Sequence, residues 1–206
     1  MEDLQSKRVS GRRWTEIGDL DPSLAGLTVL VRGSAQASRP VGKKMVFLVV
    51  RQFMSTVQCL LTADQVHVST QMAGFAKGLS RESVVDVEGV VSIPKESIRG
   101  PRHARIRVEI QVRKLYCINR AVPNLPINIE NAAWSETEIA KAEMDGEKLV
   151  RVGQDTRLNY RVLDLRTPAN LAIFSVQYKV EYAGMIIQQW NNDNVVETSD
   201  LTLALF

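Results

Sequence analysis

Residues 43–61 read KKMVFLVVRQFMSTVQCLL, a stretch that predicts two β-strands joined by a tight turn at residues 52–54. Side chains alternate between the two faces of a strand, so apolar residues at every second position indicate the face that packs into a core. That face carries Val46, Leu48, Val50, Val57, Cys59 and Leu61. The opposite face carries Phe47, Val49, Arg51, Thr56, Gln58 and Leu60.

An aromatic ring, a guanidinium and an amide are thus expected on the face turned away from the core. A flat ring beside an amide that both donates and accepts hydrogen bonds is what the recognition of an unstacked nucleic-acid base requires. A purely structural interpretation stays open, because Phe47 has apolar neighbours and an outward Gln58 is usually only solvated.

Three further strands and one helix are expected around this hairpin. The strands are predicted at residues 27–36, 83–93 and 105–116, and the helix at 67–79 with Thr70 as its cap. Gly33 predicts a bulge or bend in the first strand, and residues 38–42, with Arg39, predict a loop. Glu109 lies opposite the apolar face of the last strand. Five strands with a helix after the third are the pattern of an OB-fold, a mainly β barrel that binds oligonucleotides on one face.

Composition adds weaker constraints. The chain has 206 residues, of which 45% are hydrophobic, and 26 Lys and Arg against 23 Asp and Glu give a net charge of +3. So small a net charge is weak evidence for a polyanionic partner, although residues 95–114 are locally basic. Cys59 and Cys117 have no metal-binding spacing and are expected to be reduced thiols. No segment has the pattern of a signal peptide or a membrane span, so a cytoplasmic protein is expected.

The rest of the chain predicts a hinge and part of a second domain. Residues 1–23 are expected to form a flexible extension with the basic residues Lys7, Arg8, Arg12 and Arg13, and residues 24–120 the barrel. Residues 121–168 are expected to be a hinge with a helix within 131–148, residues 169–180 a helix that starts the next domain, and residues 181–206 a divergent tail. Arg157, Arg161 and Arg166 either contact RNA or bridge the two domains.

Five separate stretches resemble one protein family in their order and spacing. They are MVFLVVRQ (45–52), ESVVDVEGVV (82–91), VEIQVRKLY (108–116), NLPI (124–127) and QDTRLNYRVLDLRT (154–167). Over residues 24–180 the chain resembles the eukaryotic cytosolic aspartyl-tRNA synthetases. The LPI and DTRL signatures favour this enzyme over its lysine and asparagine relatives.

The resemblance implies an OB-fold that binds the anticodon stem-loop of tRNA-Asp. Phe47 matches a phenylalanine that stacks on the central anticodon base, and Gln58 matches a glutamine that reads the edge of that base. Glu109 matches an acidic residue that contacts an outer anticodon base, and Arg39 matches an arginine that also contacts the anticodon. Arg51 is expected to contact the RNA backbone without reading its sequence.

Full-length members of this family are homodimers with a class II catalytic domain that uses ATP and Mg. The residues after 180 do not resemble that domain, so this chain is expected to hold no cofactor and to bind tRNA without charging it, as a monomer or a dimer. Two alternatives are an active aspartate–tRNA ligase and a truncated product that folds poorly because an apolar helix at 169–180 is exposed.

Overall fold

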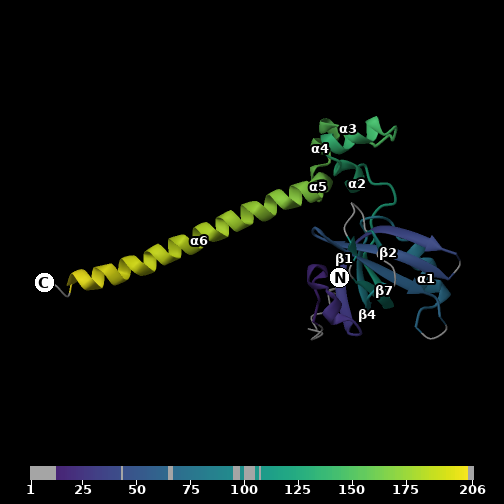
Figure 1. Cartoon of the computed structure of the whole chain (residues 1–206), viewed down its shortest axis with the longest axis horizontal. Helices are drawn as coiled ribbons and strands as arrows, with labels where there is room; N and C mark the ends of the chain where they lie inside the picture. Colours follow the sequence, from purple (N-terminus) through teal and green to yellow (C-terminus); the bar gives the residue numbers. More distant parts are fainter. Residues whose placement is uncertain are drawn as a thin grey trace, which may run out of the picture. The chain divides into compact units, whose positions relative to one another are not determined.

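The computed structural model describes residues 13–42, 44–64, 67–94, 98–99, 105–106 and 108–203. The predicted basic residues Lys7, Arg8 and Arg12 lie outside the described residues, as do residues 95–97, 100–104 and 107 of the locally basic stretch 95–114. The chain divides into two compact units, Met1–Asn124 and Leu125–Phe206, and Figure 1 labels several of the strands and helices in them.

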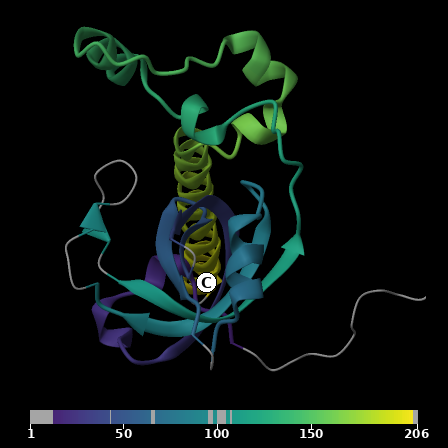
Figure 2. The ribbon, with the colours of Figure 1, turned by 90° about the vertical axis from the view of Figure 1, so that its right-hand side faces the viewer.

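A closed barrel of five strands forms the first unit, and Figure 2 shows its strands curving around a common interior. The strands are β1 (Thr28–Val41), β2 (Met45–Gln52), β3 (Ser55–Thr62), β4 (Val84–Ser92) and β7 (Glu109–Asn119). Their spatial order is β1-β2-β3-β7-β4, with β3 and β7 parallel and the other described pairs antiparallel. Short turns, η1 (Ile17–Asp19) and η2 (Pro22–Leu24), precede the barrel.

The barrel interior contains the residues whose alternation predicted a core. Valine dominates these positions, because its branched side chain fits the pleated surface of a sheet. The interior residues from the strands include Val29, Val31, Ala35, Val46, Leu48, Val50, Val57, Cys59, Leu61, Val85, Val87, Val91, Ile110 and Val112, and Val108 joins them from just before β7. Complete burial raises the pKa of the Cys59 thiol, which favours the neutral form of that side chain.

Strand β1 is longer than predicted, and it carries Arg39 on the strand instead of in a loop. The pairing with β2 continues as far as the Val41–Met45 pair, because a register shift between Ala35 and Ala37 bends the strand and lets it follow its neighbour. Beyond Ser34, the one strand that pairs with β1 among the described residues is β2. A proline is tolerated on such an edge, so Pro40 does not end the strand.

Two other boundaries in this unit differ from the predictions. Helix α1 (Thr70–Lys77) is capped by Ser69 and not by Thr70, since the Ser69 hydroxyl accepts a hydrogen bond from the Met72 amide at 3.1 Å. The last predicted strand is divided: β6 (Arg105–Ile106) pairs with β5 (Ile98–Arg99), and β7 begins at Glu109. Helix α1 packs Ala73 and Ala76 against the barrel core.

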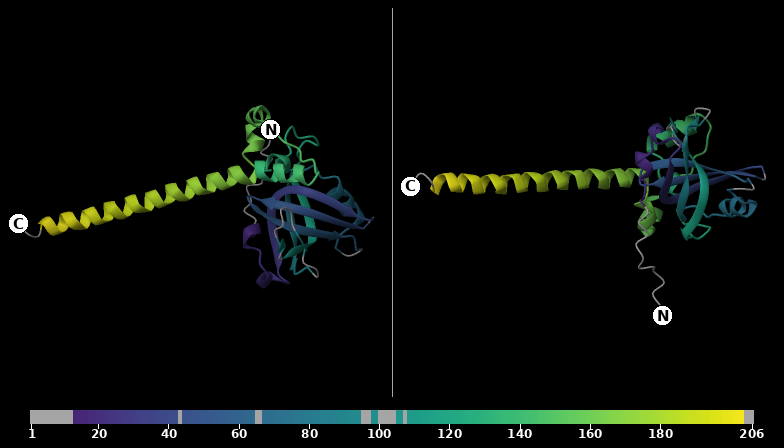
Figure 3. Two further views of the ribbon diagram at one scale, coloured as in Figure 1. Left: turned by 45° about the horizontal axis from the view of Figure 1, so that its top comes forward. Right: turned by 90° about the horizontal axis from the view of Figure 1, so that it is seen from below.

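The second unit is helical. It contains α2 (Ile129–Ala132), α3 (Glu136–Met144), α4 (Gln154–Asn159), α5 (Arg161–Asp164) and α6 (Pro168–Leu203). The helix predicted within 131–148 is therefore two helices, and a capping box between Ser135 and Glu138 starts the second one. The helix predicted at 169–180 continues as the long α6, visible in Figure 3. Pro168 begins this helix, at a position where a missing backbone N–H breaks no helical hydrogen bond.

The sequence did not decide whether Arg157, Arg161 and Arg166 contact RNA or bridge two domains. Two of these arginines make contacts within the second unit. The Asp164 side chain is 2% exposed, and Arg161 donates to its Oδ2 at 2.6 Å. Arg157 lies 3.6 Å from Asp164 Oδ1 and donates to the Ala132 carbonyl at 2.6 Å. These contacts tie α2, α4 and α5 to one carboxylate. Among the described residues, no helix is both long and apolar enough to cross a membrane.

Candidate nucleic-acid interface

Four of the five predicted site residues lie on one face of the barrel, in two neighbouring rows that cross the strands. The first row consists of Arg39, Phe47, Leu60 and Gln111. The second row consists of Val49, Gln58, Glu109 and Ser92. Paired residues on adjacent strands project to the same side, and adjacent strands lie about 5 Å apart. The eight residues therefore form one continuous surface, called the outer face below.

The four predicted residues differ in how far they are exposed. Arg39 is exposed and Phe47 is half-buried, whereas Gln58 is 4% exposed and Glu109 is 9% exposed. The last two are thus turned away from the barrel core but largely covered.

The amide of Gln58 makes no hydrogen bond among those formed by the described residues. Within the same residues, the enclosed side-chain atoms that lack a hydrogen-bond partner are Gln36 Oε1 and Asp164 Oδ1. The Gln58 amide is not one of them, although the residue is only 4% exposed. An amide without a partner among the described residues, on the face that holds the Phe47 ring, is able to donate to and accept from a ligand.

The Glu109 carboxylate, in contrast, is held by two neighbours on the outer face. Gln111 Nε2 donates to Glu109 Oε1 at 2.9 Å, and the Ser92 hydroxyl lies 3.3 Å from the same oxygen. Gln111 Nε2 also donates to Ser92 Oγ at 3.2 Å. The three side chains form a small network in which Oε1 receives both contacts to the carboxylate.

Arg51 does not share the exposed position that the sequence predicts for it. Its side chain is 9% exposed, and its Nη2 donates to both carboxylate oxygens of Glu82, at 2.9 and 2.8 Å. The Glu82 side chain is itself 6% exposed. A guanidinium enclosed and paired in this way braces β2 against the segment before β4, so its placement gives no support to the expected contact with RNA.

A second arginine contact was not foreseen from the sequence. Arg32 on β1 donates to both carboxylate oxygens of Asp86 on β4, at 2.6 and 2.8 Å, and its guanidinium carbon lies 4.4 Å from the centre of the Trp14 ring. The hydrogen bond to Asp86 raises the pKa of Arg32. The ion pair links β1 to β4, and the cation–π contact fastens Trp14, in the segment before β1, to the barrel.

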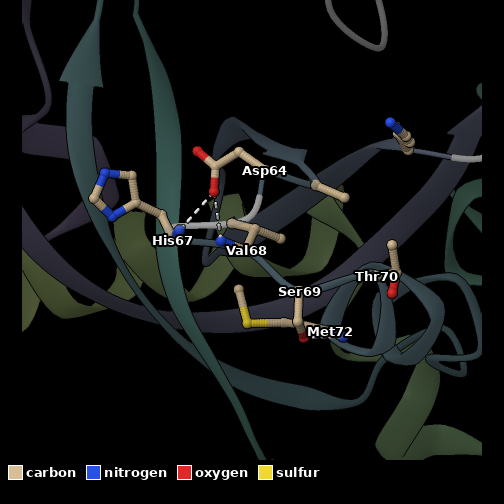
Figure 4. Close-up of a pocket in the computed structure, with 8 residues that line it drawn as sticks. Asp64, His67, Val68, Ser69, Thr70 and Met72 are labelled. Atoms are coloured by element: carbon tan, nitrogen blue, oxygen red, sulfur yellow. Dashed lines mark hydrogen bonds between the residues drawn. The ribbon is translucent and has the colours of Figure 1, made fainter.

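A cavity of about 560 Å³ lies beside the start of α1. Its lining comes mostly from the segment between β3 and α1, and none of the lining residues belongs to the two rows of the outer face. They are Lys44, Ala63, Asp64, His67, Val68, Ser69, Thr70 and Met72. Figure 4 shows Asp64 accepting hydrogen bonds from the backbone amides of His67 and Val68, which occupies one oxygen of the carboxylate. In the described part of the chain, no cluster of His, Cys, Asp and Glu is suited to a metal ion.

The fold and these surfaces define a class of protein. A closed five-stranded barrel with a helix after the third strand is an OB-fold, and the solved structures that resemble this chain include aspartyl- and asparaginyl-tRNA synthetases. The solved structure of the aspartyl tRNA synthetase from Entamoeba histolytica matches 92% of this chain, with a TM-score of 0.80 and 33% identity, over 40% of its own length. The asparaginyl-tRNA synthetase from Pyrococcus horikoshii matches 83% of the chain with a TM-score of 0.59 and 26% identity, over 33% of its own length.

Sequence comparison narrows the class further. The chain is 49% identical over 176 residues to the cytoplasmic aspartate–tRNA ligase 2 of Arabidopsis thaliana, and 40% identical over 174 residues to the cytoplasmic aspartate–tRNA ligase of Bos taurus. These matches cover 85% and 84% of this chain but 31% and 33% of the relatives, so the chain spans about a third of their length. No family model matches. The chain is thus a homologue of the eukaryotic cytoplasmic aspartate–tRNA ligases.

Proposed function

We propose that this chain binds the anticodon loop of tRNA-Asp on the outer face of its barrel. The observation that carries the proposal is the arrangement of the two rows. They place a half-buried ring, an unpaired amide and a carboxylate on adjacent strands. Aromatic rings that stack on bases and polar groups that meet base edges are the means by which proteins recognise single-stranded RNA.

Each residue of the outer face has a distinct proposed role. Phe47 stacks on the central anticodon base, and Gln58, with its free amide, pairs with the edge of that base. Glu109 accepts a hydrogen bond from an outer base. Arg39 is exposed at the end of the first row, where it can contact the RNA without being paired in the protein interior. Arg51 is left out of this set because it is enclosed with Glu82.

Substitution of Phe47 tests the stacking role. Phe47→Ala is expected to weaken binding of an RNA hairpin with the aspartate anticodon by about 1–3 kcal/mol, the usual value of one base–aromatic stack. The measurement is a titration followed by fluorescence anisotropy. Phe75→Ala is the matched control, since Phe75 is exposed on α1 and outside the two rows. Equal losses in the two variants would contradict the proposal.

Gln58→Ala tests the reading of the base edge. Aspartate codons have adenine in the middle, so the central anticodon base is uridine. Removal of the amide is expected to reduce the preference for this hairpin over one with a central cytidine, because the amide is the group assigned to the base edge. An unchanged preference would show that Gln58 does not read the base.

The relatives are named as ligases, so an enzymatic role is the second candidate. We propose that the 206 residues bind tRNA without activating aspartate, because the chain spans about a third of those relatives. The test is aspartate-dependent exchange of pyrophosphate into ATP, with a full-length cytoplasmic aspartate–tRNA ligase as the positive control. We expect no exchange above the buffer value, and a signal from the pure chain would favour the ligase.

A further inference from the structure

Phe53, at the tip of the hairpin formed by β2 and β3, has a backbone conformation that is costly for its residue type. The hairpin closes at the Gln52–Ser55 pair, so Phe53 and Met54 are the two residues of a tight turn. The φ angle of Phe53 is +52°. Glycine, asparagine and aspartate are the residues that usually take a positive φ in such turns, because a bulky side chain is strained there.

The side chain of Phe53 gains little burial that could offset this strain. It is 71% exposed, more than any other large apolar side chain described in the first unit, and Met54 beside it is 54% exposed. No stacking or cation–π contact among the described residues involves the Phe53 ring. Glu82, which also has a positive φ, differs in this respect, because its carboxylate pairs with the enclosed Arg51. The conformation of Phe53 is thus explained neither by its turn nor by its packing.

A strained residue without a structural reason directs attention to a ligand, since such residues gather at binding sites. The feature that Phe53 offers a ligand is an aromatic ring open to solvent. Such a ring is a platform on which any nucleobase stacks. The same hairpin carries Phe47 and Gln58 on the outer face. At about 3.3 Å per residue, the strand places Phe53 roughly 20 Å from Phe47.

We propose that Phe53 is a second stacking platform, which receives an unpaired nucleotide of the anticodon loop outside the three anticodon bases. This inference rests on the proposed function, which assigns the anticodon bases to the outer face. One base cannot contact two rings that lie so far apart, so the nucleotide on Phe53 is a different one from that on Phe47. Stacking does not read base edges, and the platform therefore adds affinity without adding sequence preference.

Substitutions at Phe53 test the role of the ring. The full chain and its variants are titrated with the aspartate anticodon hairpin by fluorescence anisotropy. Phe53→Asn, which removes the ring, is expected to lower the affinity roughly 5- to 100-fold, the range of one base–aromatic stack. Phe53→Tyr keeps the ring and is expected to retain the affinity. Phe75→Ala is the control, because Phe75 is an exposed phenylalanine on α1. Unchanged affinity in Phe53→Asn would overturn the inference.

The stability of the same variant shows whether the strain serves binding. Asparagine tolerates a positive φ better than phenylalanine does, so Phe53→Asn is expected to raise the midpoint of urea denaturation. A gain in stability together with a loss of affinity is the signature of strain kept for function. If Phe53→Asn instead loses stability and affinity together, Phe53 acts by holding the fold and the inference fails.

RNA hairpins that lack one base identify the nucleotide that stacks. Each hairpin of the series has an abasic residue at one loop position outside the anticodon. One of them is expected to bind the unsubstituted chain roughly 5- to 100-fold more weakly than the complete hairpin does. Phe53→Asn is expected to bind that hairpin and the complete one equally, because the stack is already lost. Equal responses of the two chains to every abasic hairpin would show that Phe53 meets no base.

The Phe47 and Phe53 variants separate a failure of this inference from a failure of the proposed function. The two rings share no base, so their losses of affinity are expected to multiply in the double variant Phe47→Ala with Phe53→Asn. If Phe47→Ala loses affinity and Phe53→Asn does not, only the second platform is refuted. If Phe47→Ala binds as tightly as the unsubstituted chain, the proposed function fails on the outer face, whatever Phe53→Asn does.

Discussion

At the scale of single residues, burial and pairing decide which polar groups are available to a ligand. Arg39 and Arg51 are the same residue type and were both predicted to contact RNA. Arg39 is exposed, whereas Arg51 is 9% exposed and bonded to Glu82. Gln58 is 4% exposed, but its amide has no hydrogen-bond partner among the described residues, so low exposure alone does not remove it from the proposed site. A polar side chain that is paired within the protein, such as Arg51, is therefore assigned a structural role. A polar side chain without such a partner, such as Gln58, is proposed to contact RNA.

The Arg51–Glu82 pair is expected to contribute to stability and not to binding. Removing one partner of a buried ion pair leaves the other charge enclosed, which costs about 3–5 kcal/mol. Arg51→Met should lower the free energy of unfolding by this amount in urea denaturation. Arg39→Met should change it by about 0.5 kcal/mol or less, as is usual for exposed sites.

Salt dependence of RNA binding completes this test. Arg39→Met is expected to reduce the slope of log affinity against log salt, because one phosphate contact releases about one counterion. A folded Arg51→Met chain is expected to keep the slope of the unsubstituted protein. Normal stability with a reduced slope in Arg51→Met would instead return Arg51 to the RNA-binding set.

At the scale of elements, the barrel depends on close approach between β1 and β2. A Cβ atom added at Gly33 would lie 2.6 Å from the backbone oxygen of Arg51 and 2.7 Å from a methyl group of Val50. Backbone atoms cannot move aside as a flexible side chain can. Strand β1 pairs with β4 as far as Ser34 and with β2 from Ser34 onward. Glycine at position 33 permits the close approach that this change of partner requires.

A matched pair of glycine substitutions tests this account. Gly33→Ala is expected to lower the free energy of unfolding by about 1–3 kcal/mol, the usual cost of overpacking. Gly74→Ala lies in α1 with no neighbouring atom within 4 Å of the new Cβ, and should raise it by about 0.5–1 kcal/mol. Both are measured by urea denaturation. Equal effects with the same sign would contradict the proposed close approach.

At the scale of the whole molecule, the two units differ in how completely they bury their apolar residues. The barrel encloses a continuous core. Helix α6, by contrast, exposes large apolar side chains, including Phe174, Tyr178 and Trp190. This exposure, which the sequence predicted for the start of the helix, is a liability for aggregation. Every residue proposed to contact RNA lies in the first unit, Met1–Asn124.

A chain that ends at Asn124 is therefore expected to bind the aspartate anticodon hairpin as tightly as the 206 residues do, within about twofold. The physical reason is that the outer face and its network are complete within the first unit. Anisotropy titrations of the two chains provide the measurement, and a cooperative thermal transition of the shorter chain serves as the control. A large loss of affinity with the fold intact would show that the second unit contributes contacts.

The amino-acid sequence by itself determined the faces of the strands, and from them the barrel and the shared position of Phe47, Gln58 and Glu109. Alternation is a local property, because each side chain's direction follows from that of the residue before it. Only the tertiary structure decided which groups meet across the strands. Glu82 lies 31 residues from Arg51, and Ser92 lies 17 from Glu109. Closure of the barrel brings these residues together in space. The alternation along a single strand cannot predict such contacts, because it depends only on neighbouring residues.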